Sequence, residues 1–380
     1  MSLGGAGVAA RRVAVEALLR IDEGAYANLV VPAVIGRSRL AERDRALATE
    51  LAYGGTRMRR ACDFLVDRFL RGPVEGPVRV VLRMGAYQLH WMGLPPHAVV
   101  STTVECAPRR ARGLVNAVLR RVADAGPVEW PDPAIELSYP DWIVQRLSAD
   151  LGGEAARAAL EQMNRPPAVT VRADGYVQDR ASQWVAGYVP VEAGDIVADV
   201  CAAPGGKATA LAHRGPSVVA ALDVREGRAG LVRENAARVG ATSVGAVVGD
   251  GTRAPLRRGA FDRVLVDAPC SGLGVLRRRP DARWRVESDA PGRLQQLQQR
   301  LLAEAAALVR PGGTLVYSVC TLTAEETVGV DAWAEVTLPS FGALAPPGDP
   351  WRGHGRGALL LPQDADTDGM FVLGLERVRR

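Results

Sequence analysis

The chain has 380 residues, the length of two to three ordinary domains. Its 48% hydrophobic and 23% charged residues are typical of a globular protein, and no apolar run reaches the roughly 20 residues that a membrane span needs. The net charge of +5 permits nucleic-acid binding but does not require it.

Cysteine and histidine usage excludes two further classes of protein. The five cysteines are odd in number and include no CxxC pair, so neither a disulfide framework nor a zinc ribbon fits. The four histidines are scattered, and we expect no metal. The first residues, MSLGGAGVAARR, lack the apolar segment of a signal peptide, so we expect free thiols in a reducing cytoplasm.

The first third of the chain has helical periodicity, with Gly or Pro in the turns. The expected helical stretches are Val8–Ile21, Ala46–Leu51, Arg60–Leu70, Pro77–Met92 and Val99–Val122. This pattern predicts an all-helical domain over residues 1–125. Residues 126–165 begin with a proline-rich stretch and continue with two short helical patterns, which predicts a linker with a short helical segment.

Residues 166–380 alternate between short β-rich runs and helical stretches. The expected strands are Ile196–Val200, Val218–Val224, Val244–Val248, Phe261–Val266 and Gly313–Ser318, with helices over Arg225–Val239 and Arg293–Val309. This alternation predicts a doubly wound, mostly parallel α/β sheet. We expect the runs Leu359–Leu361 and Phe371–Val378 to close the sheet with a hairpin.

A glycine turn follows the first expected strand, in the sequence DVCAAPGGK that ends at Lys207. Gly205 and Gly206 permit positive φ and a close approach of the backbone to a ligand. The spacing is neither GxGxxG nor GxxxxGK[ST], so it indicates neither a dinucleotide fingerprint nor a P-loop. Of the 47 basic residues 46 are Arg, as a GC-rich genome favours, which makes the single lysine conspicuous. Because ligands bind at the carboxyl ends of parallel strands, we interpret the turn as a ligand site.

Acidic residues follow the next two expected strands. Asp223 ends the second strand, about 20 residues beyond the glycine turn, where an acid typically binds ribose hydroxyls. Asp250 ends the third strand, where a similar acid could meet a base. Three successive strand ends that present polar groups to one crevice indicate an adenosine-type ligand.

Cysteines follow the fourth and fifth expected strands. Cys270 lies in DAPCSGLG and Cys320 in YSVCT. A single free cysteine is usually a small buried hydrophobic residue. Two of them at adjacent strand ends, one close to Asp267, are hard to explain by packing and indicate catalysis. Neither has a histidine close in sequence, which argues against a papain-like protease.

An arginine-rich segment, RRRPDARWR, comes directly after the first cysteine motif. It is either a solvated surface loop or, beside a catalytic edge, a loop that grips phosphates and stacks bases of RNA. We favour the second interpretation. The predicted RNA-binding residues are Arg277, Arg278, Arg279, Arg283, Trp284 and Arg285.

Together these motifs match a known family. CAAPGGK, DAPCSGLG, RRRPDARW and YSVCT, in this order on consecutive expected strands, resemble the RNA cytosine-C5 methyltransferases of the NOL1/NOP2/Sun type. The N-terminal part is similar to a NusB-like RNA-binding domain in Asp44-Arg45, Glu50–Arg57 and Gly113–Arg120. This pairing of parts is the layout of the bacterial enzymes that act on small-subunit rRNA.

The resemblance implies S-adenosylmethionine as the cofactor and a Rossmann-like class I methyltransferase domain behind the NusB-like domain. The implied cofactor-binding residues are Cys201, Ala202, Ala203, Pro204, Gly205, Gly206 and Lys207 at the methionine part, Asp223 at the ribose, Asp250 at the adenine and Asp267 near both cofactor and target base. Cys320 is implied as the nucleophile, and Cys270 as the residue that assists product release.

The implied chemistry explains a need for two thiols. Cytosine C5 is a poor nucleophile, and a thiolate that adds at C6 builds electron density at C5. A proton or hydrogen bond at N3 assists the addition, a role that we assign to Asp267. The target base must be unpaired or flipped out of its stack to be reached.

We therefore expect a cytoplasmic, monomeric methyltransferase whose partner is RNA and whose target is C5 of a cytosine in 16S rRNA. Three alternatives stay open: the same chemistry on tRNA, a non-catalytic NusB-like RNA-binding factor, and a nicotinamide-dependent oxidoreductase. The second alternative leaves the cysteine pair and Lys207 unexplained, and the third lacks the GxGxxG fingerprint.

Overall fold

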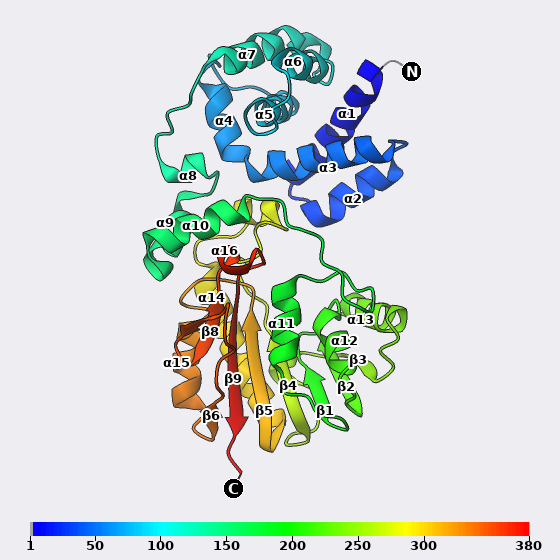
Figure 1. The fold of residues 1–380 in the computed structure, drawn as a ribbon, viewed down its shortest axis with the longest axis vertical. Helices are drawn as coiled ribbons and strands as arrows, with labels where there is room; N and C mark the ends of the chain where they lie inside the picture. Colours follow the sequence, from blue (N-terminus) through cyan, green and yellow to red (C-terminus); the bar gives the residue numbers. More distant parts are fainter. Residues whose placement is uncertain (1–2, 380) are drawn as a thin grey trace. The chain divides into compact units, whose positions relative to one another are not determined.

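The computed structural model describes residues 3–379 and divides into two compact units. The first, the helical unit, runs to Gln145 and also includes Leu276–Val286. The second, the catalytic unit, consists of Arg146–Val275 and the residues from Glu287 onward (Figure 1). In the described part of the chain, no helix is both long and apolar enough to cross a membrane.

The helical unit is built from amphipathic helices joined by turns rich in Gly and Pro. Its helices are α1 (Leu3–Asp22), α2 (Ala27–Arg37), α3 (Glu42–Arg57), α4 (Arg59–Asp67), α5 (Gly76–Trp91), α6 (Pro96–Val104), α7 (Arg112–Asp124) and α8 (Pro133–Glu136), and α9 (Asp141–Leu151) begins in it. Short 3₁₀ turns cover Arg109–Ala111 (η1) and Pro280–Trp284 (η3). The predicted all-helical character of this region is confirmed.

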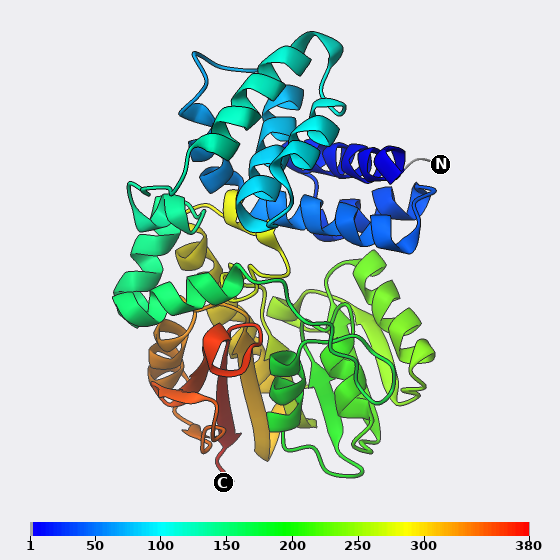
Figure 2. The same cartoon turned by 45° about the horizontal axis from the view of Figure 1, so that its top comes forward.

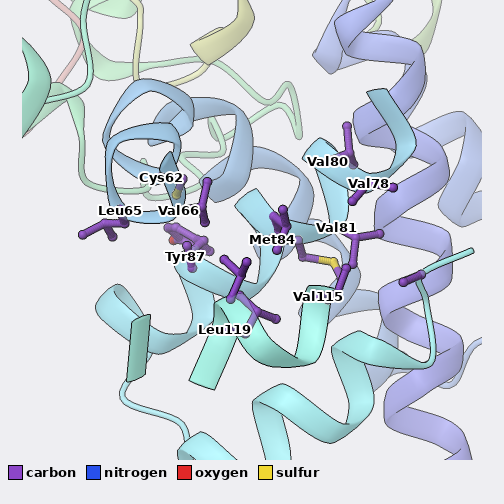
Figure 3. Close-up of a cluster of buried hydrophobic side chains, with 14 of the residues drawn as sticks. Cys62, Leu65, Val66, Val78, Val80, Val81, Met84, Tyr87, Val115 and Leu119 are labelled. Carbon is purple, nitrogen blue, oxygen red and sulfur yellow. The ribbon is translucent and has the colours of Figure 1, made fainter. Parts of the chain in front are cut away.

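The main core cluster of the helical unit includes buried side chains of α4, α5 and α7, together with others from α1, α3 and α6. Val66, Met84 and Leu119 are 0% exposed, and Figure 3 shows their side chains directed into the space between these helices. Glycine permits the closest helix contact, because a Cβ on Gly54 would lie 2.1 Å from the ring of Tyr87. Burial of such side chains stabilises the unit by about 1.5–3 kcal/mol for each fully buried large apolar residue.

The catalytic unit contains one mixed sheet. Its strands are β1 (Ile196–Asp199), β2 (Val218–Asp223), β3 (Val244–Val248), β4 (Phe261–Asp267), β5 (Val309–Val319), β6 (Phe341–Ala343), β7 (Arg352–His354), β8 (Gly357–Leu360) and β9 (Met370–Arg377). Their order is β3-β2-β1-β4-β5-β9-β8-β7, with β6 paired to β9. Strands β1 to β5 are parallel, and β9 runs antiparallel beside β5 (Figures 1 and 2).

Helices α11 (Arg180–Tyr188), α12 (Gly206–Ala212), α13 (Glu226–Arg238) and α14 (Ala290–Leu308) pack on the strands of this sheet. Helix α15 (Val328–Thr337) packs on α14, and α10 (Gly153–Met163) packs on α16 (Pro362–Ala365). A 3₁₀ turn covers Gly251–Arg253 (η2). Right-handed crossovers place α12 and α13 on one face and α14 on the other, because the strand order reverses between β1 and β4. Ligands of doubly wound sheets bind at this reversal, outside the carboxyl ends of the strands.

The predicted fold class is confirmed, with three differences in detail. Strand β5 begins at Val309, four residues before the expected start, and the expected closing pair appears as β8 and β9. Residues 126–165, predicted as a linker with a short helical segment, hold α8, α9 and α10. The helical unit extends past the predicted boundary at residue 125, and it includes a segment from the middle of the predicted 166–380 domain.

Candidate active site

The parallel strands bring the predicted site residues to one edge of the sheet. In the register of the sheet Asp199 of β1 lies beside Leu265 of β4, and Asp267 at the end of β4 lies beside Ser318 of β5. Cys320 is the second residue after Ser318, and Cys270 is the third after Asp267. The carboxyl ends of the three central strands therefore carry the acids and thiols that the sequence singles out.

The loop Cys201–Gly206 connects β1 to α12 and is fixed from outside by three long side chains. Arg228 donates to the carbonyl of Ala203 (2.9 Å), and Asn235 donates to that of Pro204 (2.8 Å). Arg172 donates to the carbonyl of Gly206 (2.5 Å) and also to Thr209. The loop is thus a preformed cradle.

Glycine is required at the tip of this loop. Gly205 has φ +104°, a conformation that side chains with a Cβ rarely adopt, and a Cβ there would lie 3.2 Å from the Cα of Val232. The tight turn brings the backbone of the loop close to the strand ends, where a ligand of the sheet would lie.

Asp223 and Asp250 lie at the neighbouring strand ends, as the sequence predicts. Asp223 ends β2 and accepts from the backbone N–H of Arg225 and from Nε of Arg228, both at 3.2 Å. Asp250 follows β3, is exposed, and accepts from the N–H and hydroxyl of Thr252 (both 2.8 Å), which lowers the pKa of its carboxyl. Both acids are held in place by local donors, and their roles toward the ribose and the adenine stay predictions.

Asp199 is a buried acid with few donors around it. It is 0% exposed, and within residues 3–379 neither of its carboxylate oxygens accepts a close hydrogen bond. Burial, and then the negative charge of Asp267, raise the pKa of Asp199 to about 7, although Lys207 and the backbone N–H of Cys201 oppose this rise. A buried acceptor of this kind beside a preformed loop fits a ligand that brings its own donors, as the amino group of S-adenosylmethionine does.

Lys207 lies among the predicted site residues at the carboxyl ends of the parallel strands. Its Nζ donates to Oδ2 of Asp267 (2.7 Å), and Ser318 Oγ donates to Oδ1 of the same carboxylate (2.8 Å). Burial opposes the charge of Lys207, but the carboxylate of Asp267 outweighs it and raises the pKa of the lysine; Cys320 acts in the same direction. The single lysine of the chain is therefore a buried ammonium between the acid of β4 and the thiol of β5.

The two thiols are in contact. Sγ of Cys270 lies 3.3 Å from Sγ of Cys320, within hydrogen-bond distance for sulfur. The hydrogen bond to Cys320, followed by burial, raises the pKa of Cys270 well above its usual value. Burial alone is the main cause of the raised pKa of the other cysteines, Cys62, Cys106 and Cys201, so these are not activated.

Comparison with known proteins agrees with this geometry. The family model of the 16S rRNA methyltransferase RsmB/F matches residues 188–376, and that of the NusB family matches residues 8–124. The ribosomal RNA small subunit methyltransferase B of Thermus thermophilus is 36% identical over 97% of this chain and 98% of its own length. The protein of the same name from Vibrio cholerae is 31% identical over 97% of both chains.

The chain belongs to the RsmB/F methyltransferase family.

Two solved structures agree with this assignment. A methyltransferase homologue from Pyrococcus horikoshii is 25% identical with a TM-score of 0.55, over 66% of this chain and 100% of that one. The crystal structure of PH0851 has a TM-score of 0.81 over 99% of this chain and 100% of that one, and at 21% identity it concerns the fold alone. As a member of the RsmB/F family the chain is a methyltransferase that uses S-adenosylmethionine.

The arginine-rich segment of this RsmB/F chain corrects one prediction. Arg277 and Arg283 are 1% and 0% exposed, so their prediction as RNA-binding residues is wrong. Arg283 lies 3.8 Å from the ring centre of Tyr139 and donates to the carbonyls of Arg57 (3.3 Å) and Ser138 (3.2 Å). Burial lowers the pKa of Arg283 to about 10.

The physical reason is the end of helix α3. The last carbonyls of a helix have no partners within it and need outside donors. Trp284 Nε1 donates to the carbonyl of Thr56 (2.8 Å), and Arg283 donates to the next one, as described above. Arg57 in turn donates to the carbonyl of Arg277 (3.2 Å). The segment is therefore an interior part of the helical unit.

The remaining residues of the segment differ in exposure. Arg285 is half-buried, pairs with Asp281 and lies over the ring of Tyr26 (3.9 Å to its centre). Arg278 is half-buried and Arg279 is exposed. Of the six predicted RNA-binding residues, Arg279 is the one that is exposed.

Three residues of the RsmB/F site were missed by the sequence analysis. Asp199 could have been identified from the sequence, because an acid at the end of a buried apolar strand is unusual. Ser318 and Arg172 could not, since their partners Asp267 and Gly206 lie 51 and 34 residues away. No group of His, Cys, Asp and Glu side chains in residues 3–379 is arranged to hold a metal ion.

Proposed function

We propose that the chain transfers a methyl group from S-adenosylmethionine to C5 of a cytosine in 16S rRNA, through a covalent bond between Cys320 and C6. The observation that carries the proposal is the pair of touching thiols, 3.3 Å apart, at the ends of two parallel strands beside a buried lysine. A single thiol would be explained by packing, and a pair with an adjacent cation is an arrangement for nucleophilic catalysis.

Cys320 acts first. The ammonium of Lys207 lies close enough to interact with it electrostatically. The form of a cysteine that attacks is the thiolate. The sulfur adds to C6 of the cytosine, and the electron pair of the C5–C6 double bond moves toward C5. The cofactor supplies an electrophilic methyl group that this electron-rich carbon takes up.

Lys207 and Asp267 recognise the base. Both oxygens of Asp267 accept hydrogen bonds, one from Lys207 and the other from Ser318. Its free lone pairs suit the N4 amino group of cytosine, a donor. The ammonium of Lys207 supplies the proton or hydrogen bond at N3, so we assign to the pair the role that the sequence analysis gave to Asp267 alone.

Cys270 completes the reaction. Its raised pKa comes first from the hydrogen bond to Cys320, so it is a neutral thiol while Cys320 is free. Once Cys320 is bonded to C6, that hydrogen bond and the neighbouring thiolate charge are gone and the pKa of Cys270 falls. Cys270 then loses its own proton to solvent and, as a thiolate or through a water that it orients, takes the proton from C5. The electron pair of the C5–H bond restores the C5–C6 double bond, the C6–S bond breaks, and Cys320 leaves as a thiolate.

The RNA substrate is inferred from the family and from the helical unit. The matching relatives are named as ribosomal RNA small subunit methyltransferases, and the N-terminal part matches the NusB family. These matches support 16S rRNA over tRNA. The exposed Arg279 is the residue of the arginine-rich segment that we still propose as an RNA contact.

A denaturing gel tests the proposal. The Cys270→Ser variant is incubated with unmodified 16S rRNA and S-adenosylmethionine, and we expect an RNA-linked band that disappears when Cys320 is also replaced by Ala. Normal methylation by the Cys320→Ala single variant would refute the nucleophile. Wild-type methylation of tRNA but not of 16S rRNA would keep the chemistry and reject the substrate.

A further inference from the structure

The residue that follows Cys270 is tied to the segment that follows Cys320 through one buried carboxylate. Glu326 is 0% exposed, and its Oε1 accepts from the backbone N–H of Ser271 (2.8 Å) and from Gln298 Nε2 (2.9 Å). Its Oε2 accepts from Ser271 Oγ (2.5 Å) and Thr323 Oγ1 (2.9 Å). Four donors thus fill the four lone-pair positions of a single carboxylate.

The hydroxyl hydrogens of this network have a defined direction. Ser271 has one hydroxyl hydrogen, which it gives to Glu326, so at 2.7 Å it accepts from Thr321 Oγ1. Thr321 is the residue directly after Cys320, and Ser271 is the residue directly after Cys270. We call the segments that carry Cys270 with Ser271 and Cys320 with Thr321 the two cysteine loops. The hydrogen bonds therefore run from one cysteine loop to the other and end on Glu326.

The network around Glu326 is also hydrogen-bonded to side chains of helix α14 and strand β5. Gln298, on α14, donates through the same amide to the carbonyl of Pro269 (2.9 Å), one residue before Cys270. The hydroxyl of Tyr317, on β5, donates to the backbone carbonyl of Glu326 (2.8 Å). A helix and a strand thus hold Glu326 relative to both cysteines.

We propose that Glu326 is a positioning residue of the methyl-transfer site, whose buried carboxylate joins the two cysteine loops and fixes the distance between their sulfur atoms. The inference rests on the proposed function for its catalytic meaning. The structural linkage itself depends only on the contacts given above.

The charge of Glu326 adds a second effect. In the described part of the chain its carboxylate pairs with no arginine or lysine, and neutral donors alone hold it. After the hydrogen bond to Cys320, burial and the charge of that residue, Glu326 is a further cause of the raised pKa of Cys270. The same carboxylate thus helps to keep the second thiol protonated.

Glutamine can take the place of this carboxylate only at a cost to the network. Its amide nitrogen cannot lie at the Oε1 position, because it would face the backbone N–H of Ser271, which cannot reverse. With the nitrogen at the Oε2 position, the hydroxyls of Ser271 and Thr323 must turn and accept instead of donating. Glu326→Gln is therefore nearly isosteric, but it removes the charged acceptor, reverses these hydrogen bonds and weakens the link between the loops.

The test measures the proximity of the two sulfurs without any methylation assay. In a Cys62→Ser, Cys106→Ser, Cys201→Ser background, thiol–disulfide exchange with glutathione gives the effective concentration of Cys270 toward Cys320. Oxidised glutathione takes up the two electrons and becomes two reduced molecules as the protein disulfide forms. We expect Glu326→Gln to lower this effective concentration roughly tenfold, because it weakens the link between the loops.

A neighbouring residue provides the matched control. Glu325 is half-buried and pairs with Arg146, and within residues 3–379 its side chain forms no hydrogen bond to the loops that carry Cys270 and Cys320. Glu325→Gln should therefore leave the effective concentration unchanged. If Glu326→Gln binds S-adenosylmethionine normally and matches Glu325→Gln in the exchange experiment, the proposal is overturned.

A second variant covers the case in which Glu326→Gln does not fold. Ser271→Ala keeps the backbone N–H bond to Glu326 but removes the hydroxyl that links it to Thr321, and it should give a smaller decrease. An unchanged value in Ser271→Ala would overturn the proposal as well.

Kinetics separate this proposal from the proposed function. With a competent RNA, Glu326→Gln should lower kcat while the KM for S-adenosylmethionine stays unchanged, since the hydrogen-bond partners of Glu326 described above lie outside the Cys201–Gly206 loop. If the wild type methylates no RNA but the exchange experiment gives the expected difference, the function fails and the positioning role stands.

Discussion

Replacement of Arg283 tests whether the arginine-rich segment is interior or an RNA contact. The guanidinium of Arg283 donates to the carbonyls of Arg57 and Ser138 and lies over the ring of Tyr139. Two hydrogen bonds from a charged donor contribute about 1.5 kcal/mol each, and the cation–π contact about 1 kcal/mol. Truncation also leaves a cavity that costs a further 1 to 2 kcal/mol, roughly.

The desolvation of the charge offsets part of this loss. The fall of the pKa of Arg283 from 12.5 to about 10 corresponds to roughly 3 kcal/mol against the buried cation. We therefore expect Arg283→Ala to destabilise the helical unit by about 3 kcal/mol. Arg283→Met keeps the volume and removes the charge, so its loss should be about 1 kcal/mol.

Hydrogen exchange of peptides from α3 localises the effect, because the carbonyls at the end of that helix lose their donor. A loss of about 3 kcal/mol should speed exchange there roughly 100-fold in Arg283→Ala, against little change in the exposed control Arg279→Ala. The interior role would be refuted if Arg283→Met kept wild-type exchange and bound RNA more weakly, with a shallower dependence on salt.

Three further predictions concern the catalytic unit. Gly274→Ala places a Cβ 2.2 Å from the carbonyl oxygen of Gly369 and 3.0 Å from that of Cys320, so it should lower kcat roughly 100-fold, and wild-type kcat would contradict the close packing. Gly205→Ala adds a Cβ at φ +104°, which costs roughly 1 to 3 kcal/mol, and calorimetry should give about tenfold weaker binding of S-adenosylmethionine; unchanged affinity would mean that the loop relaxes freely. Asp199 holds a proton in the folded state up to about pH 7 and loses it near pH 4 when unfolded, so the stability that it contributes falls as pH rises between these values. Asp199→Asn should therefore gain stability over the wild type as pH rises from 4 to 8, by at most about 4 kcal/mol, and parallel pH profiles in denaturant titrations would refute this.

The sequence contains enough information for the sheet and for most of the site. Strands β1 to β5 are short apolar runs that each end in an acid, a glycine or a cysteine, so their position and carboxyl ends could be predicted directly. Lys207, Asp267, Cys270 and Cys320 share one edge because parallel strands must align their ends. Their hydrogen bonds then follow from proximity, although the pairing of Lys207 with Asp267 spans 60 residues.

The arginine-rich segment could not be predicted in the same way. Charged residues are almost never fully buried, so the pattern favours an exposed loop. The partners of Arg283 are backbone carbonyls 226 and 145 residues away. Every residue has a backbone carbonyl, so the sequence does not indicate which ones accept a hydrogen bond from an arginine. Glu326 was missed for a similar reason, because a second glutamate stands beside it and only burial distinguishes the two.

The insertion of Leu276–Val286 into the helical unit also governs the order in which the chain can be completed during synthesis. The donors for the end of α3 leave the ribosome only after residues 146–275 have been made. At the usual 5 to 20 residues per second this interval is roughly 6 to 26 seconds. Throughout it, Tyr139 and the last carbonyls of α3 lack the cations and the indole that cover them in the finished protein. Synthesis from the N-terminus therefore cannot complete the helical unit before the catalytic unit is begun. The helical unit reaches its final packing only after Leu276–Val286 have been made.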